Sequence, residues 1–214
     1  MKKTIAVLGL GKYGQSLAEN LYKMGADVLA VDENKEIVNE FATKCTEVIC
    51  ADLSIEDEVV SLGLKNMDVV VTAMGRHLGA SILAVSVAKE QGVPVVIAKS
   101  SSERRSSILK KVGADKILDP EGEGGLRSAR ILMSSSFKDF FELDANMYLI
   151  EMFPKKEWIG KTLDNLKLRK LHNINVVAIR EEGKLWGFVD PAVPFNEKSI
   201  LLIAVEEKDI NKCQ

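Results

Sequence analysis

The feature that most constrains the fold is a regular alternation of short apolar runs and helical patterns over the first 120 residues or so. The runs are rich in Val, Ile and Ala and predict buried strands at 4–8, 27–31, 47–50, 68–73, 95–98 and 116–118. The segments between them predict helices at 12–24, 35–43, 55–62, 79–91 and 103–112. Strict alternation implies right-handed crossovers, so the sequence predicts an α/β fold with a doubly wound parallel sheet.

A glycine-rich loop joins the first predicted strand to the first predicted helix. Gly9, Gly11 and Gly14 have the spacing G-x-G-x-x-G, and Asp32 ends the next strand 18 positions after Gly14. Gly9 suits a tight turn, Gly11 lets backbone N–H groups approach a diphosphate, and Gly14 allows the helix to pack closely on the strand. This context indicates a Rossmann-like nucleotide site with the diphosphate at the helix N-terminus.

Asp32 can accept hydrogen bonds from ribose hydroxyls, and its charge disfavours the 2′-phosphate of NADP. The motif contacts only parts that NAD, ADP and ATP share, so it does not separate them. Lys12 is either a contact to a terminal phosphate or a solvent-facing lysine, and Asp52 either contacts the ligand or caps the next helix. The predicted nucleotide contacts are Gly9, Leu10, Gly11, Lys12, Tyr13, Gly14, Asp32, Glu33, Asp52, Leu53, Ala73, Met74, Gly75, Arg76 and Lys99.

The pattern changes after the segment "DPEGEGG". A long helix is predicted at 126–143, docked on its own sheet or reaching a second subunit. Short strands follow at "MYLIEMF", "NVVAIRE", "KLWGFVD" and "SILLIAV", with a short helix around "TLDNLKLRKL". We therefore expect a nucleotide-binding domain at 1–125, a connecting or dimerisation helix at 126–144, and a small α+β domain at 145–214.

Composition excludes several classes of function. The 29 basic and 31 acidic residues are mixed along the chain, which argues against a nucleic-acid partner. The apolar runs are too short to cross a bilayer, so we expect a cytoplasmic protein. Cys45, Cys50 and Cys213 have no C-x-x-C spacing and no nearby histidine, which indicates reduced thiols rather than a metal or redox site.

The residues that catalysis by a nicotinamide enzyme requires are scarce. His77 and His172 are the two histidines, and none of the three tyrosines belongs to a Tyr-x-x-x-Lys pair. His77 follows the fourth strand, where a ligand contact is expected. We therefore predict a protein that is not an enzyme. The alternatives are a small NAD-dependent oxidoreductase with His77 as its acid and base, and a redox-sensing nucleotide-binding protein.

The whole pattern resembles the RCK/KTN (TrkA-like) family, specifically the cytosolic regulatory subunits of Ktr and Trk potassium-uptake systems. The matching stretches are "AVLGLGKYGQSLAENLYKMGADVLAVD", "SLGLKNMDVVVTAMG", "AKSSSERRSSILKKVGADKILDPE" and "WIGKTLDNLKLRKLHNINVVAIREEGK". The resemblance implies an RCK N-terminal domain that binds ATP, ADP or NAD(H) as a signal, followed by an RCK C-terminal domain. It also implies homodimers that assemble into an octameric ring on an integral-membrane potassium transporter subunit, at the inner face of the membrane.

Site residues follow from the resemblance position by position. Lys12 stands where Ktr regulators often have an arginine, and a lysine keeps the charge without the bidentate fork. Glu121 matches an acidic position that lies near the nucleotide and helps to hold a divalent cation at the dimer interface; it could instead be a solvated loop carboxylate. Arg169 and Asn175 match positions that bind cyclic di-AMP in the C-terminal domain, or they are ordinary surface residues.

Overall fold

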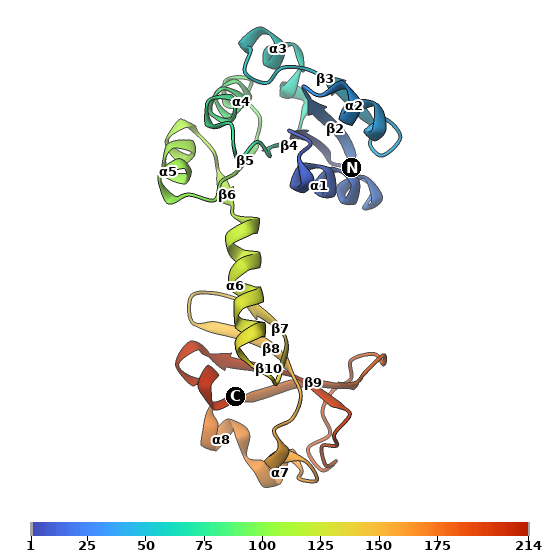
Figure 1. The fold of residues 1–214 in the computed structure, drawn as a ribbon, viewed down its shortest axis with the longest axis vertical. Coiled ribbons are helices and arrows are strands. Elements are labelled where there is room, and N and C mark those ends of the chain that lie inside the picture. The colour runs from blue at the N-terminus through green and yellow to red at the C-terminus, as the bar shows by residue number, and fades with distance from the viewer. Residues whose placement is uncertain (1, 214) are drawn as a thin grey trace. The chain divides into compact units, whose positions relative to one another are not determined.

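The computed structural model describes residues 2–213 and divides the chain into two compact units, residues 1–122 and 123–214. Figure 1 labels their elements in chain order. Each unit has its own sheet and its own apolar core.

The first unit is built on a six-stranded sheet in the order β3-β2-β1-β4-β5-β6, and every neighbouring pair is parallel. The strands are β1 (Thr4–Leu8), β2 (Asp27–Asp32), β3 (Glu47–Cys50), β4 (Val69–Thr72), β5 (Val95–Lys99) and β6 (Lys116–Leu118). The helices are α1 (Lys12–Lys23), α2 (Lys35–Phe41), α3 (Glu56–Ser61), α4 (Leu78–Glu90) and α5 (Glu103–Val112), with a 3₁₀ turn η1 (Leu64–Asn66). This arrangement confirms the predicted doubly wound sheet. The strand order reverses between β1 and β4, which is where ligands bind in such folds.

Both faces of this sheet are buried. Along β1, Ile5 and Val7 face one core with α1 and α2, whereas Ala6 and Leu8 face the other with α3, α4 and α5. Alternate residues of a strand point to opposite faces, so a strand covered on both sides must be apolar throughout. That requirement explains why the strands of this unit read as continuous apolar runs.

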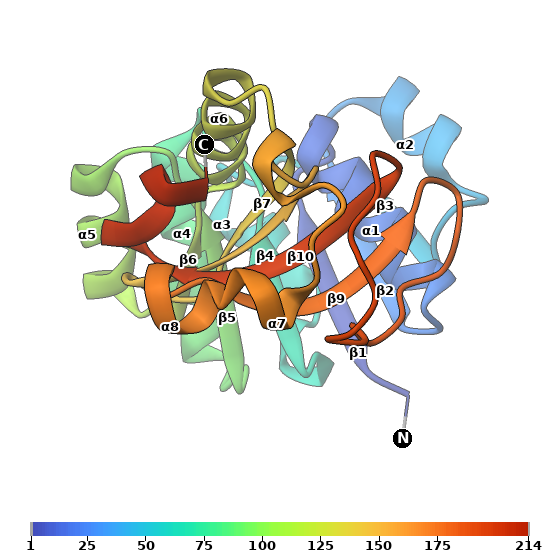
Figure 2. The same cartoon turned by 90° about the horizontal axis from the view of Figure 1, so that it is seen from below.

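The second unit contains an antiparallel sheet in the order β7-β8-β10-β9. Its strands are β7 (Phe137–Glu142), β8 (Met147–Met152), β9 (Asn175–Glu181) and β10 (Ser199–Glu206), and Figure 2 shows β9 and β10 side by side. The remaining elements are α6 (Pro120–Met133), which begins in the first unit, η2 (Lys156–Trp158), α7 (Leu163–Leu166), α8 (Leu168–His172) and η3 (Glu207–Cys213). Alternate residues of β8, namely Tyr148, Ile150 and Met152, are buried in its core.

Two sequence predictions are wrong in this region. The helix expected at 126–143 ends at Met133, and residues 137–142 form β7 instead. A turn in which the Ser136 N–H donates to Ser134 Oγ (3.2 Å) follows the helix end. Phe137 and Phe140 then both face the core because the register shifts between them, and this shift gives a strand the three-residue spacing of a helix. The strand expected at "KLWGFVD" is reduced to a single bridge between Ile179 and Gly187.

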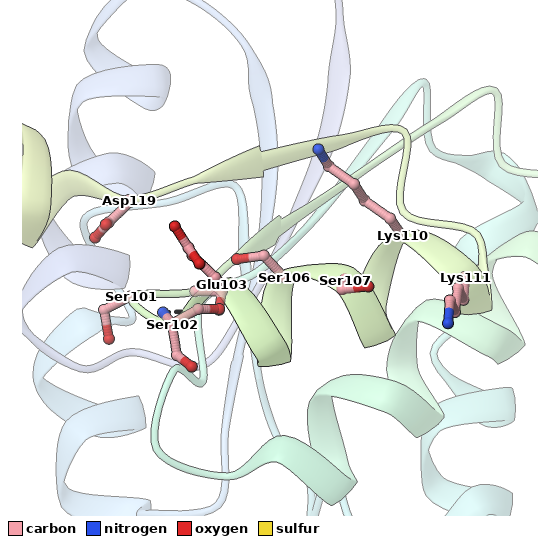
Figure 3. A pocket seen from close by; sticks show the side chains of 9 residues that line it. Ser101, Ser102, Glu103, Ser106, Ser107, Lys110, Lys111 and Asp119 are labelled. Atoms are coloured by element: carbon pink, nitrogen blue, oxygen red, sulfur yellow. Dashed lines mark hydrogen bonds between the residues drawn. The ribbon is translucent and has the colours of Figure 1, made fainter.

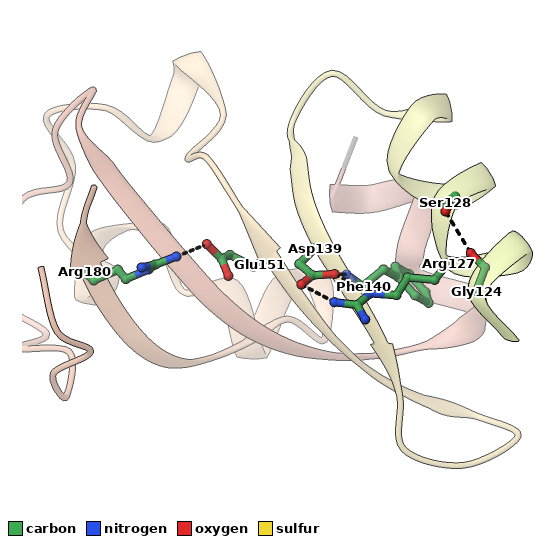
Figure 4. Close-up of polar contacts among 7 residues, drawn as sticks. All are labelled: Gly124, Arg127, Ser128, Asp139, Phe140, Glu151 and Arg180. Carbon is green, nitrogen blue, oxygen red and sulfur yellow. Dashed lines mark hydrogen bonds and ion pairs between the residues drawn. The ribbon is translucent and has the colours of Figure 1, made fainter. Parts of the chain in front are cut away.

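Ion pairs stabilise the second sheet (Figure 4). Arg127 of α6 donates from Nε to Asp139 Oδ1 at 2.7 Å, and its second nitrogen reaches the other carboxylate oxygen. Arg180 of β9 pairs with Glu151 of β8 and stacks over the Trp186 ring at 4.7 Å. Bidentate and stacked contacts of this kind suit arginine rather than lysine.

Candidate functional site

A cleft of about 860 Å³ lies at the carboxyl ends of the parallel strands in the first unit. Its wall combines the β1–α1 loop, the ends of β2 and β5, the segments after β3 and β4, and the first turn of α6. Fourteen of the predicted site residues line it: Gly9, Gly11, Lys12, Tyr13, Asp32, Glu33, Asp52, Leu53, Ala73, Met74, Gly75, Arg76, Lys99 and Glu121.

The three glycines of the loop have different surroundings. Gly9 has a φ of +97°, and a Cβ there would lie 2.6 Å from Met74 Cγ. A Cβ on Gly14 would lie 1.9 Å from the Gly9 carbonyl oxygen, so Gly14 brings α1 close to the loop without lining the cleft. Gly11 is exposed, and a Cβ there would have no neighbour within 4 Å. Only Gly11 therefore has free space above its backbone, where a ligand can approach.

Asp32 both shapes the loop and faces the cleft. Its Oδ2 accepts a hydrogen bond from the Leu10 N–H at 2.6 Å, and its Oδ1 accepts one from the Asn34 N–H at 2.9 Å. Leu10 is fully buried, so its contribution is this N–H donor and not a contact at the cleft surface. A carboxylate has further lone pairs, so Asp32 can still accept from a ribose hydroxyl.

Asp52 lies beside Asp32 at the same edge of the sheet. Its Oδ1 accepts from the Ser54 hydroxyl at 2.6 Å and from the Ser54 N–H at 2.8 Å. These two hydrogen bonds hold the pKa of the Asp52 carboxyl below its usual value, because they favour the charged form. Asp52 therefore supports the start of the turn before α3 and presents a second carboxylate to the cleft.

Four basic side chains also line the cleft. They belong to Lys12, Arg76, Lys99 and Arg105, which come from four different parts of the chain. Arg105 donates from Nη1 to the carbonyl oxygen of Gly75 at 2.9 Å and so braces the segment after β4. These cations can pair with an anionic group of a ligand, while Asp32, Glu33, Asp52 and Glu121 supply carboxylates to the same cleft.

Lys99 and Glu121, which both line the cleft, form an ion pair. The hydrogen bond from Lys99 lowers the pKa of the Glu121 carboxyl. Among residues 2–213, no group of three His, Cys, Asp or Glu side chains is arranged to hold a metal ion. The cation predicted at Glu121 thus has no complete set of ligands within one copy of the chain.

Several cleft residues were not predicted: Ile37, Ser54, Ala80, Ser101 and Arg105. Arg105 is the most consequential of them because it carries charge. Its only signal in the sequence is its place in the first turn of the helix that follows β5, a position that parallel sheets direct toward the ligand edge.

The remaining candidates differ in location. His77 lies in the cleft wall, and among the described residues its imidazole has no hydrogen-bond partner. His172 ends α8 in the second unit. Arg169 of α8 and Asn175, the first residue of β9, are exposed in that unit.

A second hollow of about 620 Å³ lies along α5 (Figure 3). Five serines dominate its wall, with Lys110, Lys111, Glu103 and Asp119 around them. Ser101 lines both this hollow and the main cleft. The hollow contains both basic and acidic side chains, so it has no clear preference for a positively or a negatively charged ligand.

Comparisons with known proteins agree with this architecture. The family model described as TrkA-N domain matches residues 5–120. The chain is 31% identical over 210 residues to the Ktr system potassium uptake protein A of Bacillus subtilis, covering 98% of this chain and 95% of that protein. It is 35% identical over 211 residues to the protein of the same name from Vibrio alginolyticus, covering 98% and 96%. A solved structure of the GsuK channel bound to NAD has a TM-score of 0.66 and 12% identity, over 98% of this chain and 38% of that one.

No helix within the described residues is long and apolar enough to span a membrane.

Proposed function

The chain belongs to the TrkA-N family, and we propose that it is the nucleotide-sensing regulatory subunit of a potassium-uptake transporter. One observation carries this proposal. A chain similar over nearly its full length to Ktr potassium uptake proteins has a cleft at the switch point of its parallel sheet, and both carboxylates and cations line this cleft.

The cleft offers a distinct partner to each part of an adenine nucleotide. In this proposal Asp32 and Asp52, which line the cleft, accept hydrogen bonds from ribose hydroxyls. The open backbone at Gly11 and the N-terminus of α1 suit a diphosphate. Lys12 and Arg105, two cations of the same cleft, are the proposed contacts of an additional phosphate.

The ligands that we propose are ATP or ADP, with NAD(H) as the other candidate. The cations of the cleft can pair with a terminal phosphate, which the nicotinamide end of NAD lacks. The GsuK channel, whose fold is similar, has been solved with NAD bound. Lys12 is the residue that distinguishes the two ligands in this proposal, because only a nucleoside triphosphate or diphosphate ends in a phosphate next to the loop.

Regulation follows from differential binding. A nucleotide can change the shape of an assembly only if it binds one shape better than the other. We propose that homodimers of this chain form an octameric ring on the inner face of the cell membrane, attached to the membrane subunit of the transporter. Exchange of the nucleotide then changes the shape of the ring and the flow of potassium, without chemical conversion of the nucleotide.

Two further ligands stay predictions. A divalent cation at Glu121 requires donors from a second copy or from the nucleotide, because one chain supplies no cluster of three metal ligands among its described residues. Cyclic di-AMP is expected at Arg169 and Asn175 from the family resemblance alone; both side chains are exposed and available for a phosphate and a polar contact.

The first test is the thermal stability of the chain with ATP, ADP, NADH and NADPH. A ligand present at 100 times its Kd stabilises the folded state by about 2.7 kcal/mol, so specific binding raises the Tm. We expect a rise with adenine nucleotides that lack a 2′-phosphate and a smaller rise in Asp32→Asn. If none of the four ligands shifts the Tm, the proposal is wrong. Steady oxidation of NADH that disappears in His77→Ala would indicate an oxidoreductase instead.

A further inference from the structure

Lys99 is the point at which three segments around the cleft meet. It ends β5, its side chain is only 13% exposed, and its ammonium lies 5.4 Å from the centre of the Tyr13 ring. A Cβ built on Gly75 would lie 3.7 Å from Lys99 Cδ, so the lysine stem passes this backbone at van der Waals distance. Its Nζ ends in the ion pair with Glu121. One side chain therefore contacts α1, the segment after β4 and the first turn of α6.

This lysine differs from the other cations of the cleft. Within the described part of the chain, Lys12, Arg76 and Arg105 have no carboxylate partner, whereas Lys99 pairs with Glu121. The Glu121 side chain is 58% exposed, so it is the more mobile member of the pair. A lysine ammonium has three donors, but a carboxylate and a phosphate held on the same ammonium repel each other. An arriving phosphate and Glu121 must therefore compete for Lys99.

The first turn of α6 is weakly held. It contains Gly122 and is followed by Gly124 and Gly125, and glycine disfavours a helix interior more than any residue except proline. Asp119 Oδ1 accepts from the Gly122 N–H at 2.9 Å, and Glu121 is bound to Lys99. Among the described residues these two contacts are the side-chain hydrogen bonds of residues 120–123, and the next turn has one more, from Ser128 Oγ to the Gly124 carbonyl oxygen at 2.8 Å. When the contact between Lys99 and Glu121 is lost, the first turn keeps only the hydrogen bond from the Gly122 N–H to Asp119.

We propose that the Lys99–Glu121 pair is a latch that the phosphates of a bound nucleotide open. This proposal rests on the proposed function. The phosphates of the nucleotide act on α6 through Lys99, and Glu121 weakens phosphate binding because it competes for the same ammonium. Because α6 runs from the first unit into the second, the freed turn is where occupancy of the cleft would first alter the connection between them. Adenosine without phosphates leaves the latch closed.

The binding test compares Glu121→Gln with Glu123→Gln, which removes the same charge from the same exposed helix segment away from the cleft. ATP, ADP and adenosine are titrated calorimetrically in EDTA, so that no cation bridges Glu121 to phosphate. We expect Glu121→Gln to bind ATP and ADP about two- to fivefold more tightly, the scale of a half-exposed ion pair, and adenosine equally. Unchanged or weaker binding of ATP and ADP, or an equal gain in Glu123→Gln, overturns the latch.

The conformational test is hydrogen exchange of the segment 119–126. We expect faster exchange with ATP than with adenosine in the natural chain, and fast exchange without ligand in Lys99→Met, which keeps the length and apolar stem of the side chain. Equal exchange in all these states contradicts the proposal. The two levels of failure are distinguishable: absence of any nucleotide binding refutes the proposed function, whereas normal binding with an unresponsive segment refutes the latch alone.

Discussion

Replacing Gly14 by alanine should damage the fold of the first unit. The new Cβ would lie 1.9 Å from the Gly9 carbonyl oxygen and 3.0 Å from its carbon, whereas ordinary contact begins near 3.4 Å. Both atoms belong to the backbone, so α1 must move away from the loop by more than 1 Å or so to relieve the overlap. Overpacking of this kind costs about 1–3 kcal/mol and occasionally more, and because Gly14 is buried and the overlap is with backbone, Gly14→Ala should lie at or above the upper value.

The matched control is Gly11→Ala. Gly11 has a φ of −62° and open space around its Cβ position, so alanine should leave the free energy of unfolding within about 0.5 kcal/mol of its original value. The added methyl group instead occupies the space where a diphosphate would approach the backbone. We therefore expect Gly11→Ala to keep its stability and lose nucleotide affinity, and Gly14→Ala to lose both.

Thermal unfolding followed by circular dichroism, together with calorimetric titration of ADP, separates these effects. A loss of about 3 kcal/mol corresponds to a fall in Tm of about 10 °C for a domain of this size. A Gly14→Ala chain with unchanged Tm would show that the tight approach of α1 is not needed. Unchanged ADP affinity in Gly11→Ala would place the phosphates away from the loop.

Three further predictions concern separate parts of the chain. Asp32→Asn should weaken adenine-nucleotide binding by about 1–3 kcal/mol in calorimetry, the scale of a charged hydrogen bond, while an Asp32→Ala chain should also lose stability because the Leu10 N–H loses its acceptor. In the native chain only the exposed thiol of Cys50 should react rapidly with an aromatic disulfide reagent, because burial raises the pKa of the Cys45 and Cys213 thiols to about 11. After denaturation all three thiols should react. The hydrogen bond from Arg127 lowers the pKa of the Asp139 carboxyl below its usual value of 3.8. The ion pair should therefore stabilise the second unit above pH 3.8 and stop doing so as the pH falls through the lower pKa of the folded state. In denaturant unfolding, the free energy of unfolding should fall less between about pH 5 and pH 3 in Arg127→Met than in the natural chain.

The parallel sheet was predictable because its physical cause is local. The central strands β1, β2 and β4 are buried on both faces and must be apolar along most of their length, and the crossovers between parallel strands are helical, so the pattern repeats clearly. β1, β3 and β6 begin and end where the sequence predicts. The glycine loop was predictable for the same reason, since Gly9 and Gly14 meet backbone or side-chain atoms within a few residues of the turn or across one neighbouring strand.

The second unit was less predictable because a register shift imitates a helix. Phe137 and Phe140 are three residues apart and both buried, which is the spacing of a helical face. Residues 126–133 are helical, so the pattern continues across the break at Ser134 without a change of period. The segment "KLWGFVD" gave the opposite error: its apolar residues suggested a strand, yet Leu185 and Phe188 are almost fully exposed. A short apolar run indicates a strand only where a second layer covers it.

The residues of the cleft were predictable to different degrees for a topological reason. Asp32 and the glycines belong to one continuous strand–loop–helix–strand unit, so spacing along the chain places them together. Lys12 belongs to the same unit, whereas Arg76, Lys99 and Arg105 come from elements that are distant in sequence and become its neighbours only through the strand order β1-β4-β5-β6. Arg105 reaches the cleft because β5 lies next to β4, and its hydrogen bond to Gly75 joins the ends of these two crossovers. The residues proposed to contact the shared part of an adenine nucleotide, together with Lys12, can therefore be identified from the sequence alone, whereas Arg105 could not be, because its place in the cleft depends on the order of the strands.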